Sequence, residues 1–223
     1  CIQAVARGGL PQHNPQMTQM AQMLPGTRAG LESTQPLEAL GARLLAERRL
    51  SADGATSCLD CHQPARGYTD GRATAAPGGL NTPPLWGLAA RGRYGWFSPE
   101  VTTLEAQLRR PLADPAEMGP LRDATLARLR ADPALVAAYG RAFPHAPVLV
   151  TWEQSVAALA AAVHAIEPPP GPYARLLAGD AAALAPAARR GQALFVELGC
   201  ASCHQGPGLA SDSYHSVGVA ADP

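Results

Sequence analysis

The chain has 223 residues, of which 47% are hydrophobic, so it is long enough to bury a core in one or two compact domains. Its 18 basic residues are all arginine, and 18 acidic residues balance them to a formal net charge of zero. This balance argues against a nucleic-acid-binding surface and against a partner steered by strong charge. The longest mostly apolar run, residues 156–166, has about half the length of a membrane span.

The first 30 residues are rich in Gln, Pro, Gly and Met and predict a loosely ordered arm. Met17, Met20 and Met23 recur every three residues, and a helical turn packed on the body is favoured over a set of copper-binding thioethers. Cys1 has two interpretations. It is either the lipid-modified first residue of a mature lipoprotein or a cysteine at which the numbering simply starts.

Helical periodicity accounts for most of the chain after the arm, and no strand-like alternation of apolar and polar residues occurs. The first helix is predicted over residues 37–48, and residues 64–84 follow as a long loop without apolar period. Further helices are predicted over residues 102–110, 121–130, 133–143, 151–166, 173–178 and 187–198. Thr151 and Gln154 have the spacing of a capping box. A proline-rich break at residues 168–172 is the clearest domain boundary.

Two pentads of the form Cys-x-x-Cys-His are the most informative feature of the sequence. Their cysteines and histidines are Cys58, Cys61, His62, Cys200, Cys203 and His204. Cysteines three apart face the same side of a helical turn, so both thiols can add to one porphyrin while the next histidine binds its iron. A zinc site of four cysteines shares the Cys-x-x-Cys spacing but has no use for a histidine after each pair. The pentads therefore predict two covalently bound haems c.

The pentads and the helical pattern together predict an all-α protein with two cytochrome c-like haem domains. Residues 1–30 are the arm, residues 31–167 the domain of the first haem and residues 168–223 the domain of the second. Covalent haem attachment predicts a periplasmic location, because c-type haems are joined to exported chains. A lipid anchor at Cys1 would tether the protein there.

Several ordered segments between Leu37 and Val219 resemble the bacterial di-haem cytochrome c peroxidase family, which includes the MauG-type enzymes. These are residues 50–54, 81–83, 103–107, 111–119, 172–180 and 214–219. The resemblance implies an oxidoreductase whose first haem reacts with hydrogen peroxide and whose second haem relays electrons.

The resemblance also assigns roles to three polar residues outside the pentads. Glu117 matches the family's distal acid, Gln107 a glutamine that hydrogen-bonds in the same pocket, and Asn81 a calcium ligand between the domains. A carboxyl in an apolar haem pocket has its pKa raised toward the range in which it can move peroxide's proton. On pattern alone, Glu117 would be a surface residue, Gln107 a polar helix position and Asn81 a turn former.

The sequence departs from the family pattern at three places. Residues 63–107 contain no histidine, so the family's blocking ligand is absent and an open first haem is expected, as in MauG-like members. The inter-haem tryptophan falls at Phe97, with Trp96 adjacent as an alternative electron relay. Family members continue well past the second pentad, whereas this sequence stops at Pro223. The second domain is therefore expected to be truncated, or its haem to take a sixth ligand from elsewhere, with His215 as the local candidate.

Two catalytic outcomes are open within this resemblance. One is a peroxidase that takes electrons from a small c-type cytochrome or a cupredoxin, and the other is a MauG-like enzyme that oxidises a side chain of a partner protein. The missing loop histidine favours the second. The alternative from another class is a non-catalytic di-haem electron carrier, which would leave Glu117 without a role. No nucleic-acid partner is expected.

Overall fold

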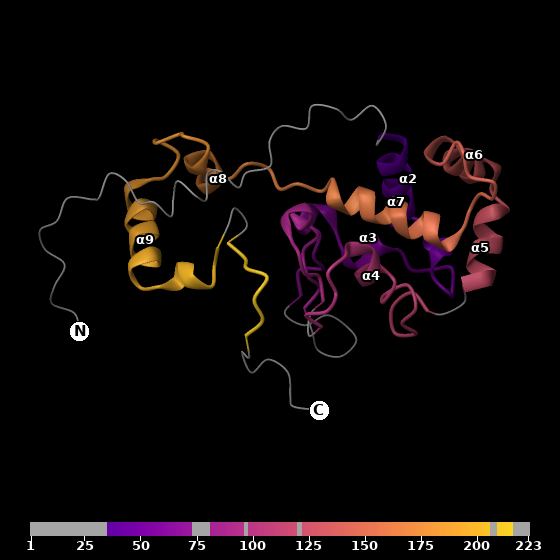
Figure 1. Ribbon diagram of the computed structural model, residues 1–223, viewed down its shortest axis with the longest axis horizontal. Coiled ribbons are helices and arrows are strands. Elements are labelled where there is room, and N and C mark those ends of the chain that lie inside the picture. Colours follow the sequence, from indigo (N-terminus) through magenta and orange to yellow (C-terminus); the bar gives the residue numbers. More distant parts are fainter. Residues whose placement is uncertain (1–34, 73–80, 96–97, 120–121, 206–208, 216–223) are drawn as a thin grey trace, which may run out of the picture. The chain divides into compact units, whose positions relative to one another are not determined.

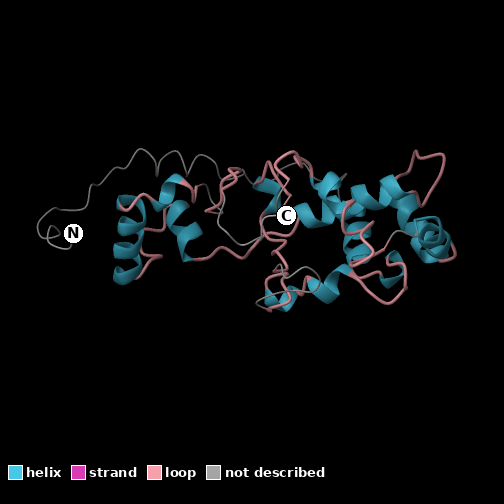
Figure 2. Cartoon of the chain, turned by 90° about the horizontal axis from the view of Figure 1, so that it is seen from below, coloured by secondary structure: helices cyan, strands magenta, loops and turns pink. Residues whose placement is uncertain are grey.

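The computed structural model describes residues 35–72, 81–95, 98–119, 122–205 and 209–215, all in helices, turns and loops (Figures 1 and 2). Within these ranges it holds no strand, and a single antiparallel bridge joins Gln63 to Thr69. This confirms the all-α prediction. The described chain divides into two compact units. The first comprises residues 35–168 with 214–215, and the second residues 169–213.

Each helix predicted from periodicity is present, with bounds that differ by a few residues. The first unit contains α2 (Gln35–Leu45), η1 (Arg48–Leu50), α3 (Cys58–Cys61), η2 (Pro64–Arg66), η3 (Leu88–Ala90), α4 (Leu104–Leu108), α5 (Arg122–Arg130), α6 (Pro133–Ala142) and α7 (Trp152–His164). The second unit contains α8 (Pro172–Leu177), α9 (Pro186–Glu197) and η4 (Cys200–Ser202). The predicted 37–48 helix ends at Leu45, and the chain then turns into the separate 3-10 helix η1.

The close crossing of α2 and α7 is the centre of the first unit (Figure 1). Leu40 and Leu44 of α2 are buried against a core that includes Leu159 of α7. At the crossing, a Cβ atom added to Gly41 would lie 1.8 Å from the carbonyl oxygen of Ala158. Only glycine therefore allows the two backbones to approach this closely, and the crossing supports the segment that carries the first pentad.

The N-terminus of α7 is held by the predicted capping box. The Thr151 hydroxyl accepts from the Gln154 amide N–H at 3.2 Å, and the Gln154 carbonyl Oε1 accepts from the Thr151 N–H at 3.0 Å. Just before it, the buried Val150 has a φ of 61°, which is unusual for a β-branched residue. Arg130 of α5 donates to the Val150 carbonyl at 2.9 Å and so anchors this strained residue.

An ion-pair network joins α2, η1 and α6 around Asp132. The Asp132 carboxylate accepts from the Leu135 N–H at the start of α6 and pairs with Arg49 at 2.9 Å and Arg43 at 3.1 Å. Arg49 also pairs with Glu47 at 2.6 Å. The hydrogen bond from Arg49 and those from the first amides of α6 hold the pKa of Asp132 below its usual range.

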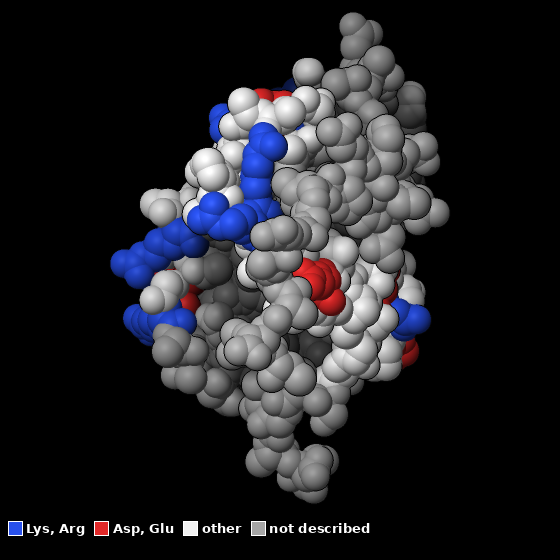
Figure 3. All heavy atoms as spheres, turned by 90° about the vertical axis from the view of Figure 1, so that its left-hand side faces the viewer, with Lys and Arg blue, Asp and Glu red and all other residues white. Residues whose placement is uncertain are grey.

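The second unit is small and exposes most of its residues. No residue of α9 is buried, and Leu198 just beyond it is 74% exposed. Residues 214 and 215 belong to the first unit, because the Tyr214 hydroxyl donates to the Gly95 carbonyl. None of the helices in the described ranges is long and apolar enough to cross a membrane. Figure 3 shows arginine and acidic side chains together on one face, in keeping with the balanced charge.

Candidate functional site

The first pentad forms the short helix α3, which sets its two thiols one turn apart. The Asp60 carboxylate accepts from the Ser57 N–H at 2.7 Å and from Arg48 at 2.7 Å, so both the start of α3 and its approach from η1 are fixed. Burial raises the pKa of the Cys58 thiol to about 11 and also raises that of Cys61. Both thiols are free and stand on one side of the same turn, as attachment to one porphyrin requires.

The imidazole of His62 is held by the turn that follows α3. Its Nδ1 atom lies 3.0 Å from the carbonyl oxygen of Tyr68, which has a left-handed φ of 59°. With Nδ1 held by Tyr68, Nε2 is the nitrogen that would bind a metal, and the ring has a second backbone hydrogen-bond partner in Pro83. Burial lowers the pKa of His62 and so favours the neutral form that acts as a ligand.

The second pentad repeats this arrangement in the other unit. Cys200 and Cys203 are free and exposed, and the Nδ1 atom of His204 lies 3.0 Å from the carbonyl oxygen of Leu209. Leu209 also has a left-handed φ, here 49°. The ring of Phe195 from α9 lies 5.9 Å from the His204 ring, measured between centroids. Nothing in the sequence marked Tyr68 or Leu209, because a left-handed non-glycine residue has no residue-type signature.

Glu117 interacts electrostatically with the first pair of thiols although it is distant from them in the sequence. Burial is the main cause of the raised pKa of Cys58 and of Cys61, and the charge of Glu117 adds to it in both. The surrounding protein atoms limit hydration of this carboxyl and raise its pKa, and the charge of Asp114 raises it further. Glu117 is nevertheless exposed at the surface.

The buried side-chain oxygen of Gln107, Oε1, has no hydrogen-bond partner among the described residues. An unsatisfied buried acceptor is costly and often marks a site that a further group completes. An oriented histidine and two free thiols on one turn therefore fit a covalently bound haem.

The remaining predicted site residues are Asn81, Trp96, Phe97 and His215. Asn81 is described and exposed, beside the buried Thr82, whose side chain hydrogen-bonds to Asp70. The described ranges hold no group of three or more acidic, histidine or cysteine side chains suited to a metal ion. Trp96 and Phe97 lie outside the described residues, as do the arm residues Cys1, Met17, Met20 and Met23. His215 lies in the unit of the first pentad, whereas the second pentad lies in the other unit.

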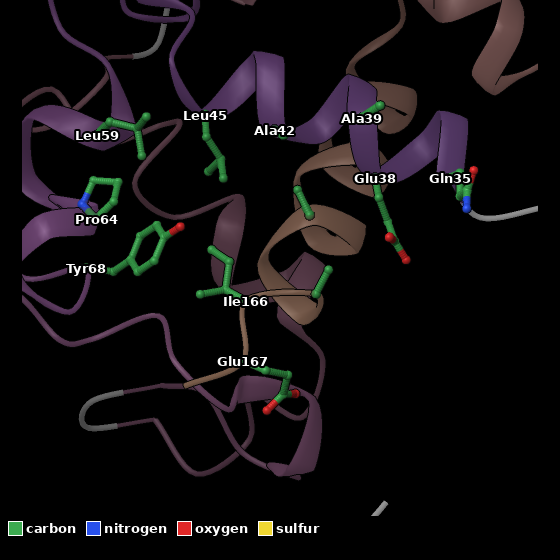
Figure 4. Close-up of a pocket in the computed structure, with 12 residues that line it drawn as sticks. Gln35, Glu38, Ala39, Ala42, Leu45, Leu59, Pro64, Tyr68, Ile166 and Glu167 are labelled. Carbon is green, nitrogen blue, oxygen red and sulfur yellow. The ribbon is translucent and has the colours of Figure 1, made fainter. Parts of the chain in front are cut away.

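A surface pocket of about 650 Å³ lies between α2, the end of α7 and the turn that orients His62 (Figure 4). Leu59, Pro64, Tyr68 and Ile166 are among its lining residues, and neither thiol of the first pentad is. The pocket thus adjoins the first pentad at Leu59 without including Cys58 or Cys61. Tyr68 joins the two features, because its ring lines the pocket while its carbonyl holds His62.

The fold and the two pentads together define a c-type cytochrome with two haem sites. The sequence model of the family described as di-haem cytochrome c peroxidase matches residues 35–182. The chain therefore belongs to the di-haem cytochrome c peroxidase family, whose cofactors are two covalently bound c-type haems. This confirms the family resemblance and the cofactor predicted from the sequence.

Individual relatives include both named branches of the family. The chain is 34% identical to the methylamine utilization protein MauG of Methylorubrum extorquens over 82% of its own length and 53% of that protein. It is 31% identical to the cytochrome c peroxidase Ccp of Escherichia coli over 82% of its length and 40% of that protein. The chain thus spans about half the length of these curated relatives.

Solved structures give the same assignment. A MauG-like protein associated with microbial copper homeostasis superposes with a TM-score of 0.75 at 30% identity, covering 88% of this chain and 60% of that one. The diheme peroxidase BthA from Burkholderia thailandensis superposes with a TM-score of 0.64 at 26% identity, covering 85% and 53%.

Proposed function

We propose that this chain acts in a periplasmic di-haem oxidoreductase that reacts with hydrogen peroxide at the haem held by Cys58, Cys61 and His62. The observation that carries the proposal is the electrostatic interaction of Glu117 with both thiols of the first pentad, together with its own raised pKa. A carboxyl there can exchange protons with a peroxide near neutral pH. A carrier that only passes electrons has no use for such a group.

The chain's own residues divide the work as follows. Cys58 and Cys61 attach the porphyrin, and His62 presents Nε2 because Tyr68 holds Nδ1. When bound, the haem would supply the redox chemistry that reduces peroxide. Glu117 would accept the proton from the near oxygen and return it to the leaving oxygen. The side-chain amide of Gln107, whose oxygen has no partner among the described residues, would supply a hydrogen bond in the same pocket, as the family pattern implies.

The second haem, held by Cys200, Cys203 and His204, would relay electrons to the first. We assign the relay between them to Trp96 or Phe97 on the family pattern, and a calcium ion at Asn81 on the same basis. The predicted periplasmic location rests on the covalent attachment of both haems.

Two substrates for the oxidising equivalents fit the chain. The relatives include a cytochrome c peroxidase, which favours a small c-type cytochrome or a cupredoxin as electron donor, and MauG proteins, which favour a protein partner. The absence of histidine from residues 63–107 favours the MauG-like outcome, because no imidazole there can close the distal face.

The proposal is tested by Glu117→Gln in the haem-loaded protein. The amide preserves shape and hydrogen bonding but cannot transfer a proton, so the peroxide reaction should slow on the order of 10²- to 10⁴-fold with both haems retained. Glu100→Gln is the matched control, because Glu100 is an exposed carboxylate paired with Arg110 at 3.4 Å. Stopped-flow absorbance gives both rates. A parental rate in Glu117→Gln would remove the observation on which the proposal depends.

A further inference from the structure

A single arginine, Arg128 of α5, donates hydrogen bonds to three backbone carbonyls of the segment that leads from η1 to the first pentad. Its guanidinium donates to the carbonyl of Ala52 at 3.2 Å, to that of Arg49 at 3.3 Å and to that of Ser51. It also donates to the Thr125 hydroxyl at 3.2 Å on its own helix. Its Nε atom is buried without a partner among the described residues. The planar fork of arginine suits such a cluster of acceptors, which one ammonium group could not cover.

The segment that Arg128 contacts, Arg49–Ala52, also packs against the turn that carries Glu117. The Ala52 N–H donates to the carbonyl of Met118, the residue after Glu117. Gly119 follows with a left-handed φ of 84°, and a Cβ atom added there would lie 2.6 Å from the Ala52 Cβ. The backbone on the C-terminal side of Glu117 is therefore in close contact with Ala52. Met118 and Gly119 are both buried, so this contact is shielded from water.

We propose that Arg128 is a positioning residue for Glu117. It fixes the Arg49–Ala52 carbonyls against α5, Ala52 fixes Met118, and the turn that carries Glu117 is thereby held in place. This inference rests on the proposed function of Glu117 and adds to it the residue that sets the carboxyl's place.

Loosening this support should change both the rate and the pH dependence of the peroxide reaction. The charged group that acts on the carboxyl is Asp114 on its own turn; the Cys58 and Cys61 sulfurs no longer titrate once they are joined to a haem. Glu117 must be ionised to accept a proton, so the rate rises with pH through its pKa. We call this rise the acid limb of the rate–pH profile. A better hydrated carboxyl has a lower pKa, which moves the acid limb to lower pH.

The experiment compares variants of the haem-loaded full chain. In Arg128→Met the acid limb should move down by about half a pH unit or more. The plateau rate should fall on the order of ten- to a hundredfold, because the carboxyl is displaced. Hydrogen exchange at the Ala52 amide should become faster. Arg128→Lys should fall between this variant and the parent.

Arg130→Met is the matched control. Arg130 lies on the same helix and also donates to a carbonyl, but its hydrogen bond goes to Val150 rather than to the Arg49–Ala52 segment. Arg130→Met should lower the stability of the protein and leave unchanged both the pH of the acid limb and the hydrogen-exchange rate of the Ala52 amide. If Arg128→Met does not fold, Arg128→Lys and Gly119→Ala perturb the same contact, the second from the Met118 side.

A double-mutant cycle separates this inference from the proposed function. If Arg128 acts through Glu117, adding Arg128→Met to Glu117→Gln should slow the peroxide reaction no further. Independent losses, or an Arg128→Met protein with parental acid limb and exchange, would overturn the positioning role alone. A parental rate in Glu117→Gln would instead overturn the catalytic role of the carboxyl, and with it this inference.

Discussion

The Nδ1 atom of His62 lies 3.0 Å from the carbonyl oxygen of Tyr68, and the relation recurs at 3.0 Å between His204 and Leu209. In both pairs the carbonyl belongs to a non-glycine residue with a left-handed backbone. A non-glycine residue in this region costs about 1–2 kcal/mol, so the surrounding turn must stabilise it. Both turns therefore hold the imidazole in the same way, through Nδ1, so that Nε2 is the nitrogen that would bind iron.

Each pentad should carry its own haem. Replacing Cys58 and Cys61 with serine should remove one covalent haem and leave the other, because serine offers no thiol for the vinyl groups. The paired change at Cys200 and Cys203 should have the reciprocal effect. Mass spectrometry after acid-acetone extraction measures the haem that stays on the chain. Zinc in place of iron in the parent protein would contradict the assignment of both sites.

The crossing of α2 and α7 should not tolerate a side chain at Gly41. In Gly41→Ala the added methyl meets the Ala158 carbonyl, and the free energy of unfolding should fall by about 2–3 kcal/mol. Gly140→Ala on α6 is the control, because its Cβ would meet only Leu149 at an ordinary 3.6 Å. There alanine should be neutral or stabilising by about 0.5–1 kcal/mol. Urea denaturation followed by circular dichroism compares the two. Equal stabilities would mean that the helices do not cross this closely.

The local features of this protein were readable from its sequence, and the long-range ones were not. The Thr151–Gln154 capping box and the helices follow from residue type and apolar spacing over a few turns. By contrast, nothing in the spacing places Arg128 against three carbonyls of a segment far from it in the chain. Resemblance to a family pointed to Glu117, but its electrostatic interaction with Cys58 and Cys61 depends on tertiary packing.

The Asp132 network should give the first unit an acid-sensitive stability. The pKa of Asp132 is depressed in the folded state, so its contribution is fully present above its usual pKa of about 4 and is lost as the pH falls through the lower folded value. Asp132→Ala should therefore be less stable than the parent at pH 7, and the difference should be smaller at about pH 3, because the carboxyl of the unfolded chain is then mostly protonated. Urea midpoints at both pH values measure this. Glu167→Ala, which removes an exposed carboxylate, serves as control. A difference of equal size at both pH values would show that Asp132 stabilises without its charge.

The first haem should be open to small ligands in the resting ferric protein. Residues 63–107 supply no histidine to block the face opposite His62. A high-spin component should therefore be visible and should bind cyanide without prior reduction. Electron paramagnetic resonance and absorbance titration report both. A purely low-spin spectrum that does not respond to cyanide would show that another side chain occupies the distal position.

The fate of the oxidising equivalents should distinguish the two catalytic outcomes. Peroxide added to the protein alone should produce an oxidised state, because an accessible first haem and Glu117 are sufficient to cleave the oxygen bond. A peroxidase would discharge this state rapidly into a reduced small cytochrome or cupredoxin. A protein-modifying enzyme would retain it until a specific partner docks and would then change that partner's mass. Stopped-flow decay with each reduced donor, together with mass spectrometry of the product of a neighbouring gene, separates the cases. Rapid donor oxidation with an unmodified partner would exclude the MauG-like outcome, and no reaction with peroxide would leave only the electron carrier.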